Sequence, residues 1–379
     1  MTQTEQPQGA RVFFADLRAR GPKESKISKI GRLFQKAGFD ACIGKDALTA
    51  VKVHVGERGN DTFVSPVFVR KVVECIKTAG GKPFLTDSNT LYKGSRHNAV
   101  DHMATAIEHG FSYATVDAPF IVADGLRSTS YEEVLINKQH FSSVKIASAI
   151  TAAQSMIVLS HFKGHELAGF GGAVKNLAMG CTPSQGKCDQ HATKFFVNQE
   201  KCIHCGLCIT SCPQNAVSYV PYNDAKAAVI DTAVCVGCGE CLTVCKPKAV
   251  GINWKTELKP FNERMAEYAY GAVYDKQNHV GYINFLLNIT PDCDCVPWSD
   301  APLVPDIGIL ASTDPVALDS ACYDLVNQAT GHAHSHLQCG HTPGENKFTG
   351  VWQHTCGEVQ LDHAAKIGLG TREYELISL

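Results

Sequence analysis

Eight cysteines fall in two short segments with identical spacing, and this repeat constrains the fold more than any other feature of the sequence. Residues 202–213 read CIHCGLCITSCP, and residues 235–247 read CVGCGECLTVCKP. Each cysteine of the second segment lies 33 residues after its counterpart in the first. Such regularity predicts two copies of one structural unit.

The spacing within each segment is that of ligands to a four-iron, four-sulfur cluster. Three cysteines separated by two residues each can surround three irons of a cubane, while the fourth, three residues further on, reaches the neighbouring cluster. The pattern therefore predicts two 4Fe-4S clusters with crossed ligand sets. The first is expected to use Cys202, Cys205, Cys208 and Cys245, and the second Cys235, Cys238, Cys241 and Cys212.

A zinc site is the alternative for CxxC pairs. A tetrahedral zinc takes two such pairs and would leave the third close cysteine of each segment unused. The segments resemble the bacterial two-cluster ferredoxins, with all eight ligands in register. One departure is Lys246, which separates the last cysteine from Pro247. The resemblance implies a module that transfers electrons.

Composition adds limits on location and partners. The chain has 17 cysteines, more than a cytoplasmic protein would hold as disulfides, because thiols there are kept reduced. Its polar N-terminus and the lack of a long apolar run predict a cytoplasmic protein, with residues 1–10 as a disordered tail. The formal net charge of -2 favours neither nucleic acid nor an anionic membrane as a partner.

Helical and strand-like segments alternate along the rest of the chain. The clearest helix, 65–79, has Ser65 at its N-cap position, Pro66 in its first turn and Gly80 after its end. Further helices are expected at 25–37, 97–109 and 314–329, and strands at 12–17, 51–55, 83–86, 155–160, 280–287 and 306–310. This alternation predicts an α/β fold, a mostly parallel sheet with helices on both faces. Two smaller α/β units are the alternative.

Residues 198–254 interrupt this alternation with a segment rich in Cys, Gly and Pro. The residues after it hold too few elements for an independent α/β domain but enough to complete a sheet begun earlier. We therefore expect a discontinuous α/β domain, 11–197 and 255–379, with a two-cluster ferredoxin-like α+β module inserted at 198–254.

The strand at 155–160 leads into HFKGHELAGFGGAVKNLAMGC, residues 161–181, which is the candidate site of the α/β domain. Open α/β sheets bind ligands where their strands end, and a glycine-rich turn before a helix can bind an anion. The candidate catalytic residues are His161, Lys163, His165 and Lys175, and the candidate cofactor-binding residues are Gly169, Gly171, Gly172 and Asn176. The alternative is that the glycines serve a tight turn and that Lys175 is solvated.

Two further groups contain metal-binding residue types. Cys293 and Cys295 alternate as strand neighbours do and are expected to face one side. They can bind a metal together with His161, His165, Cys181 or His191, present a nucleophilic thiolate, or simply pack near the clusters. The segment 331–341, GHAHSHLQCGH, is expected to be a surface loop with adventitious metal affinity.

Several stretches together resemble the family catalogued as domain of unknown function 362. They are the 161–181 segment, TDSNT at 86–90, CDCVPWSD at 293–300 and VPDIGILASTDPVALD at 304–319. The resemblance implies that these loops converge in an α/β domain with an inserted ferredoxin module. It implies no particular reaction.

These observations lead to one functional hypothesis and two alternatives. We expect an iron-sulfur oxidoreductase, specifically a reductase, whose module relays electrons to a small anionic substrate or a second cofactor in the α/β cleft. A flavin or an additional metal is compatible with the same cleft, and a ferredoxin or a reductase is the expected redox partner protein. The alternatives are an electron-transfer or docking subunit without its own chemistry, and a non-redox lyase or isomerase with structural clusters.

Overall fold

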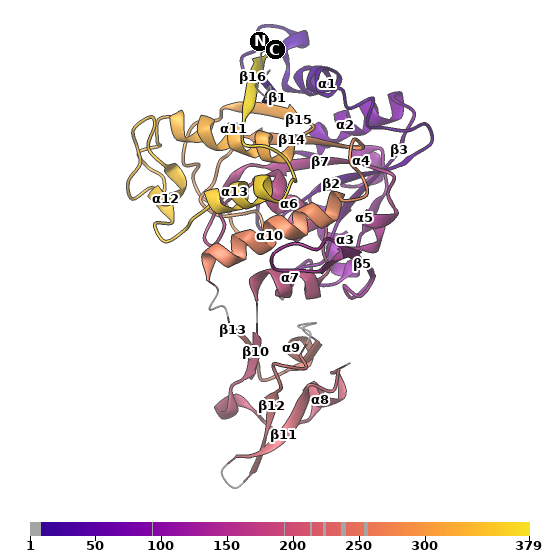
Figure 1. The fold of residues 1–379 in the computed structure, drawn as a ribbon, viewed down its shortest axis with the longest axis vertical. Coiled ribbons are helices and arrows are strands. Elements are labelled where there is room, and N and C mark those ends of the chain that lie inside the picture. The colour runs from indigo at the N-terminus through magenta and orange to yellow at the C-terminus, as the bar shows by residue number, and fades with distance from the viewer. Residues whose placement is uncertain are drawn as a thin grey trace, which may run out of the picture.

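A computed structural model describes residues 9–379 except 93, 193, 213, 223–224, 236–239 and 254–256. Cys238, an expected cluster ligand, lies outside the described residues. Within them the chain forms one large α/β domain and a smaller module that projects from one end of it, toward the bottom of Figure 1.

The α/β domain is built on an eight-stranded sheet with the order β16-β1-β15-β14-β7-β2-β3-β4. Its strands are β1 (Ala10–Ala15), β2 (Leu48–Val53), β3 (Lys82–Asp87), β4 (Phe120–Val122), β7 (Ser155–His161), β14 (Val280–Leu286), β15 (Gly308–Ser312) and β16 (Tyr374–Ser378). Only β15 runs antiparallel to its neighbours β1 and β14, and the other neighbouring pairs are parallel. The predicted α/β fold with a mostly parallel sheet is confirmed.

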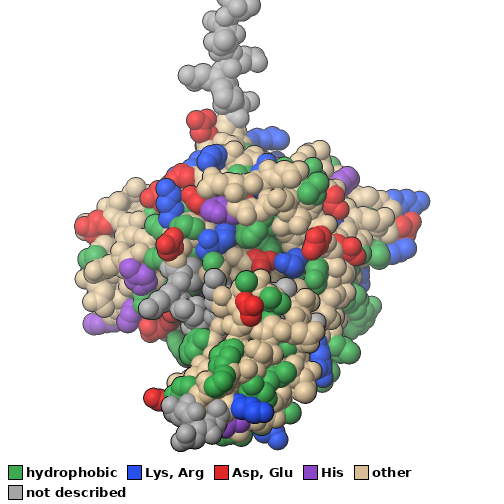
Figure 2. All heavy atoms as spheres, turned by 60° about the horizontal axis from the view of Figure 1, so that its bottom comes forward, with side chains coloured by type: hydrophobic (Ala, Val, Ile, Leu, Met, Phe, Trp, Pro, Cys, Tyr) green, Lys and Arg blue, Asp and Glu red, His purple; other side chains and the backbone are tan. Residues whose placement is uncertain are grey.

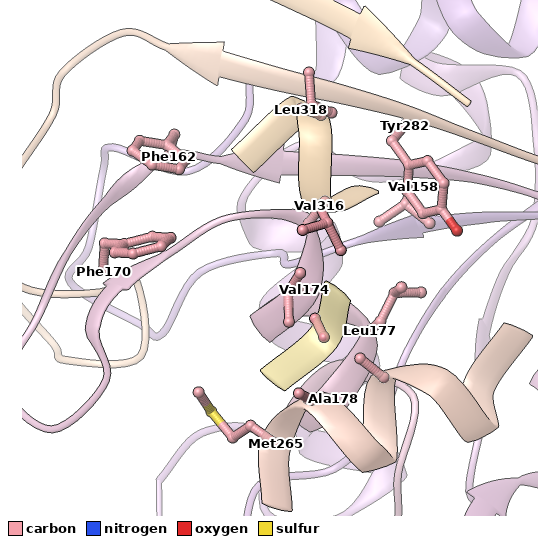
Figure 3. Close-up of a cluster of buried hydrophobic side chains, with 14 of the residues drawn as sticks. Val158, Phe162, Phe170, Val174, Leu177, Ala178, Met265, Tyr282, Val316 and Leu318 are labelled. Atoms are coloured by element: carbon pink, nitrogen blue, oxygen red, sulfur yellow. The ribbon is translucent and has the colours of Figure 1, made fainter. Parts of the chain in front are cut away.

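Helices cover both faces of this sheet because its strands are apolar on both sides. Along β7, Met156 and Val158 point into one core, and Ile157 and Leu159 point into the other. The first face carries α6 (Ala173–Gly180), α10 (Leu258–Val273), α11 (Pro315–Gln328) and α13 (Glu358–Lys366), and the second carries α1 (Lys26–Lys36), α2 (Pro66–Thr78), α3 (Ala99–Glu108) and α4 (Tyr113–Val116). Figure 3 shows side chains of α6, α10 and α11 meeting beside Val158 of β7.

The four helices expected from the sequence all form, and their ends follow from local signals. Asp314 caps α11 by accepting the amide N–H groups of Val316 and Ala317. Ser65 occupies the N-cap position of α2, but its side chain makes no capping hydrogen bond. The six predicted strands also form. The predicted tail was too long, however, because Ala10 already belongs to β1.

The described part of the cysteine-rich module contains two antiparallel strand pairs and two short helices. Strands β10 (Lys194–Val197) and β13 (Val250–Asn253) form one pair, and β11 (Val217–Tyr222) and β12 (Ala225–Ile230) form the other. The helices are α8 (Leu207–Thr210) and α9 (Glu240–Val244), with a 3-10 turn at Gln199–Lys201. The sheet strands β1 to β7 precede this module in sequence, and β14 to β16 follow it.

The remaining elements belong to the large domain and lie outside its eight-stranded sheet. They are α5 (Ser148–Ala152), α7 (Ser184–His191), α12 (Lys347–Val351), the 3-10 turn Pro22–Glu24, the pair β5 (Tyr131–Leu135) and β6 (Ser143–Ala147), and the pair β8 (Lys163–His165) and β9 (Gly169–Gly171). None of the helices described is long and apolar enough to cross a membrane.

Candidate functional site

The two halves of the cysteine module make equivalent contacts, as the sequence repeat predicts. Cys212 Sγ accepts the amide N–H of Ala216 at 3.2 Å, and Cys245 Sγ accepts that of Ala249 at 3.1 Å. The amide of Asn198 donates to the carbonyl of Ala249, in the other half of the repeat. In the equivalent hydrogen bond, the amide of Asp231 in the second half donates to the carbonyl of Ala216 in the first half. The halves are therefore related by an approximate twofold axis.

Four sulfurs of the module surround one small void. The void is lined by Cys202, Cys205, Cys208 and Cys245, together with Tyr219 and apolar side chains. Burial, and then the neighbouring thiols, raise the pKa of Cys208. Four converging cysteine sulfurs fit an iron-sulfur core, whose irons would bind the thiolates and whose ligand sulfurs would accept amide N–H···S bonds.

The second expected ligand set can be followed in part. Cys212, Cys235 and Cys241 belong to the same buried apolar cluster as Cys208. The fourth member of the set, Cys238, lies outside the described residues.

The α/β domain contains a cavity of about 690 Å³. Its wall is formed by the segments that follow β2, β3, β7 and β14, at the carboxyl ends of these parallel strands, and by parts of α6, α7 and α10. This is the edge at which open α/β sheets bind ligands. Among the lining residues are His54, Arg96, His161, Lys163, His165, Lys175, Lys187, His191, Cys293, Asp294 and Cys295.

Lys175 differs from the other cations of the cavity in its contacts with the described residues. Arg96 is paired with Glu57, and Lys187 donates to Ser88 and to a backbone carbonyl. Lys175 has no hydrogen bond or ion pair with any described residue. Burial and the charge of Lys163 lower the pKa of Lys175 to about 7. A bound anion would supply the missing counter-charge.

His161 lies in the cavity wall with both ring nitrogens occupied. Its Nδ1 is 2.8 Å from the carboxylate of Asp294, and its Nε2 is 2.9 Å from the carbonyl oxygen of Asn288. Both partners are acceptors, so both nitrogens act as donors. Burial opposes the charge on Asp294, but His161 and then Lys163 lower the pKa of that carboxyl far below its usual value. In this arrangement His161 positions the loop that contains Asp294.

His165 keeps one ring nitrogen available. Its Nδ1 accepts the backbone N–H groups of Leu167 and Ala168 at 3.1 and 3.0 Å. Burial, and next the charge of Lys175, lower its pKa well below the usual range, so the ring is neutral. Because Nδ1 is an acceptor, the single ring proton resides on Nε2.

Cys293 and Cys295 are joined by a disulfide in the cavity wall. They lie in a loop after β14 rather than in a strand, and they face one side as expected, since their sulfurs are bonded to each other. Together with His165 they form a group of three metal-capable side chains whose ligand atoms lie within 4.8 Å of one another. Within the described residues this group includes neither His161, Cys181 nor His191.

The glycine-rich turn before α6 does not leave its backbone amides free for an anion. The buried carboxylate of Asp319 accepts the N–H groups of Ala173 and Val174 at 2.8 and 2.9 Å. A Cβ on Gly172 would lie 2.3 Å from Asp319 Oδ1, so glycine is needed for this approach. The helix N-terminus that was expected to bind a ligand anion is therefore occupied by a side chain of the protein itself.

The other predicted cofactor-binding residues support the turn or the wall. Gly169 has a φ of 79°, and a Cβ at this position would lie 2.8 Å from the Cα atom of Gly357. Gly171 packs against the stem of Lys175. Asn176 lines the cavity, donates to β7 through Leu159 O, and accepts a hydrogen bond from Lys52.

The histidine-rich segment 331–341 lies apart from the cavity lining. His332, His334 and His336 are exposed in a loop with turns. None of its residues belongs to the metal-capable group found among the described residues. The prediction of a surface loop agrees with this placement.

A family model matches residues 49–324, on both sides of the cysteine module, and is described as domain of unknown function (DUF362). The chain belongs to the DUF362 family. The resemblance noted in its loops is thereby confirmed. Three of the four segments share one cavity in this DUF362 chain, those after β3, β7 and β14, and the fourth reaches the 161–181 segment through Asp319.

The other comparisons add little. No curated protein matches the chain. Among solved structures, the lactate racemase apoprotein from Thermoanaerobacterium thermosaccharolyticum is similar with a TM-score of 0.43 and 12% sequence identity, over 86% of this chain and 58% of that one. The similarity is too low to bear on the chemistry of the DUF362 cavity.

Several cavity residues of this DUF362 chain were missed by sequence analysis. Arg96 and Lys187 lie in segments without a recognisable motif. Lys52 does not line the cavity, but it is buried near the end of β2 and forms an ion pair at 2.8 Å with Asp87, which does line it. A lysine beside Val51 and Val53 in a strand was a signal that could have been noted.

Proposed function

We propose that this protein is an iron-sulfur oxidoreductase, and specifically a reductase, in which the cysteine module delivers electrons to a small anionic substrate in the α/β cavity. The observation that carries the proposal is the convergence of Cys202, Cys205, Cys208 and Cys245 on one void. These are the four ligands that the sequence spacing assigns to one cluster.

A direct connection between module and cavity supports the relay. Leu91 lines the cavity and is buried. With Cys188 of α7 it also belongs to the apolar cluster that contains Cys208 and Cys241. The cluster-binding cysteines are thus separated from the cavity by packed protein rather than by water, which suits electron transfer over a fixed path.

The lysines of the cavity support an anionic substrate, because the lining carboxylates Glu57, Asp87 and Asp294 are already paired with cations. Lys175 has no hydrogen bond or ion pair with a described residue, and Lys163 pairs with Asp294 at 3.7 Å. Bound clusters would supply single electrons. Lys175 would bind and orient the anion, and the apolar side chains of Leu91, Met179 and Phe261 would limit water around it.

The module also offers a place for a redox partner protein. Ile203, Leu207 and Tyr219 are exposed beside the void that the four cysteines line. Figure 2 shows apolar side chains gathered on the part of the molecule that contains the module. A ferredoxin or a reductase docking here would reach the first ligand set directly.

The proposal is tested with anaerobically reconstituted protein. Two 4Fe-4S clusters require about eight irons per chain and reversible bleaching by dithionite. Sulfate, which keeps its charge across neutral pH, serves as the probe for the cavity. Lys175→Met should weaken sulfate binding by about tenfold or more at pH 6, whereas Lys23→Met, at an exposed site, should not change it.

Two results would contradict the proposal. If the reconstituted protein holds zinc and no iron, the module cannot relay electrons and the proposed function is wrong. Equal sulfate affinity for the wild type and Lys175→Met would remove the assignment of the cavity to an anion.

A further inference from the structure

We propose that the Cys293–Cys295 disulfide is redox-active, and that its reduced form reduces a small disulfide substrate bearing carboxylate groups. The inference rests on the proposed function and specifies both the electron acceptor in the cavity and the substrate class. It begins from the position of the two sulfurs, which lie in the cavity wall beside His165.

The loop that contains the two cysteines is fixed at its middle residue. The carboxylate of Asp294 is bonded to His161 and to the hydroxyl of Thr62, and its carbonyl oxygen accepts the amide of Glu57. The hydroxyl of Tyr92 donates to the carbonyl oxygen of Cys295 at 2.8 Å. Opening the disulfide breaks none of these bonds, so the two thiols would remain adjacent and ready to close again.

The protonation of His165 favours thiol chemistry over a metal site. A metal bound at Nε2 needs the lone pair of that nitrogen. The amides of Leu167 and Ala168 both donate to Nδ1, which leaves the ring proton on Nε2. A ring nitrogen of His165 and the two sulfurs lie within 4.8 Å of one another, and an N–H donor at this place would stabilise a thiolate.

Other nearby groups favour a thiolate in the same way. Lys163 and Lys175 line the same cavity and are cationic when protonated, and a positive neighbour promotes ionisation of a thiol. The amide of Cys295 donates to Cys293 Sγ at 3.4 Å. Cys293 is buried and Cys295 is half-buried, so Cys295 is the sulfur that a substrate would meet first.

The electron balance matches the two-cluster module. Reduction of the disulfide takes two electrons and one proton and yields one thiolate and one thiol. Each cluster carries one electron, so the pair supplies both. The Cys295 thiolate then attacks the substrate disulfide and releases one substrate thiolate. Cys293 passes its proton to the released substrate thiolate and attacks the mixed disulfide, which restores the Cys293–Cys295 bond and releases the second substrate thiolate.

The cations of the cavity select the substrate class. A disulfide with carboxylate groups would place a negative charge beside Lys175 while its sulfur reaches Cys295. The residues come from one cavity of about 690 Å³, a size typical of small-molecule sites.

The first experiment follows the cysteines during reduction. Reconstituted protein is reduced anaerobically with stoichiometric dithionite, its thiols are trapped with iodoacetamide, and the peptide that contains Cys293 and Cys295 is weighed by mass spectrometry. We expect alkylation of both residues in the wild type and retention of the disulfide in Cys208→Ala over the same time. Clusters that accept no electrons would refute the proposed function. Reduced clusters beside an intact disulfide would refute this inference alone.

The second experiment tests the substrate class with two alkyl disulfides. Reduced protein should consume dithiodipropionate, a dianion, at least tenfold faster than the neutral hydroxyethyl disulfide. Cys295→Ser should abolish both reactions, while Cys339→Ser, at an exposed thiol outside the cavity, should abolish neither. Lys175→Met should remove the preference for the dianion. Unchanged turnover in Cys295→Ser, or equal rates for the two disulfides in the wild type, would overturn the inference.

Discussion

The cysteine module and the α/β cavity assemble their functional groups in opposite ways. In the module the expected ligands all come from residues 202–245, and three of the four that converge on one void, Cys202, Cys205 and Cys208, belong to one short segment, while Cys245 comes from its repeat. The cavity takes its lining from residues between His54 and Pro297, which only the sheet brings together. A sequence therefore reveals the first kind of site directly and the second kind only through the fold.

The largest expected effect tests whether the two regions are separable. Cys208→Ala removes a ligand from the void and should cost about four of the eight irons, or all of them if the halves are interdependent. The far-UV circular dichroism and thermal melting of the α/β domain should persist, because its core clusters contain no residue of the module. Loss of both regions together would show that they form one folding unit.

The second prediction concerns the buried carboxylate of Asp319, which accepts backbone amides at the start of α6. Asp319→Ala leaves the amides of Ala173 and Val174 and the side chain of Asn284 without their acceptor. Unsatisfied buried donors of this kind should cost about 2–4 kcal/mol of the free energy of unfolding. Urea denaturation measures the loss, and Gln328→Ala at an exposed position of the same helix is the control.

A smaller loss of stability is expected when a methyl group is added beside Asp319 and no hydrogen-bonding group is removed. The added Cβ of Gly172→Ala would meet Asp319 Oδ1 at 2.3 Å and force the turn away from α11. The cost should be about 1–3 kcal/mol in the same denaturation experiment. Gly38→Ala is not a suitable control because its φ is positive; Gly21→Ala is, since nothing lies within 4 Å of the new atom. Equal stability of both variants would show that the contact with Asp319 is not tight.

The smallest expected effect is the pH dependence of sulfate binding in the cavity, which depends on the charge of Lys175. Lys175 has a pKa of about 7 in the folded protein, so it is charged below this pH and neutral above it. Sulfate affinity should therefore fall by roughly tenfold between pH 6 and pH 8, since about one lysine in ten remains charged one unit above its pKa. Isothermal titration calorimetry checks this dependence. A break near pH 7 that persists in Lys175→Met would assign it to another group.

The fold was predictable where local signals and burial agree. The strands at 155–160 and 280–287 are apolar on both sides because helices cover both faces of the sheet. Asp314 and Pro315 marked the start of α11 by the same chemistry that caps it in the structure. The antiparallel placement of β15 had no such signal, since its pairing depends on strands far away in sequence.

The candidate site was predictable only in part, for a similar reason. His165, Lys175 and Cys293 were recognised as chemically capable residues, and they do line one cavity. Asp319 was not, because a carboxylate inside a helix gives no hint that it will cap a different helix. The closure of Cys293 onto Cys295 depends on a loop conformation, whereas the sequence indicated only that the two residues face one side.

The position of β1 in the sheet has a consequence for how the chain matures. This strand pairs with β15 and β16, and all the module lies between it and them. On the ribosome, β1 must wait until both partners have emerged, and β7 must wait for β14. The module, whose contacts are mostly internal, can fold during this interval and would then bind the iron of the proposed clusters. We expect metal loading to precede closure of the cavity, so the newly made chain would receive its electron carriers before it can bind a substrate.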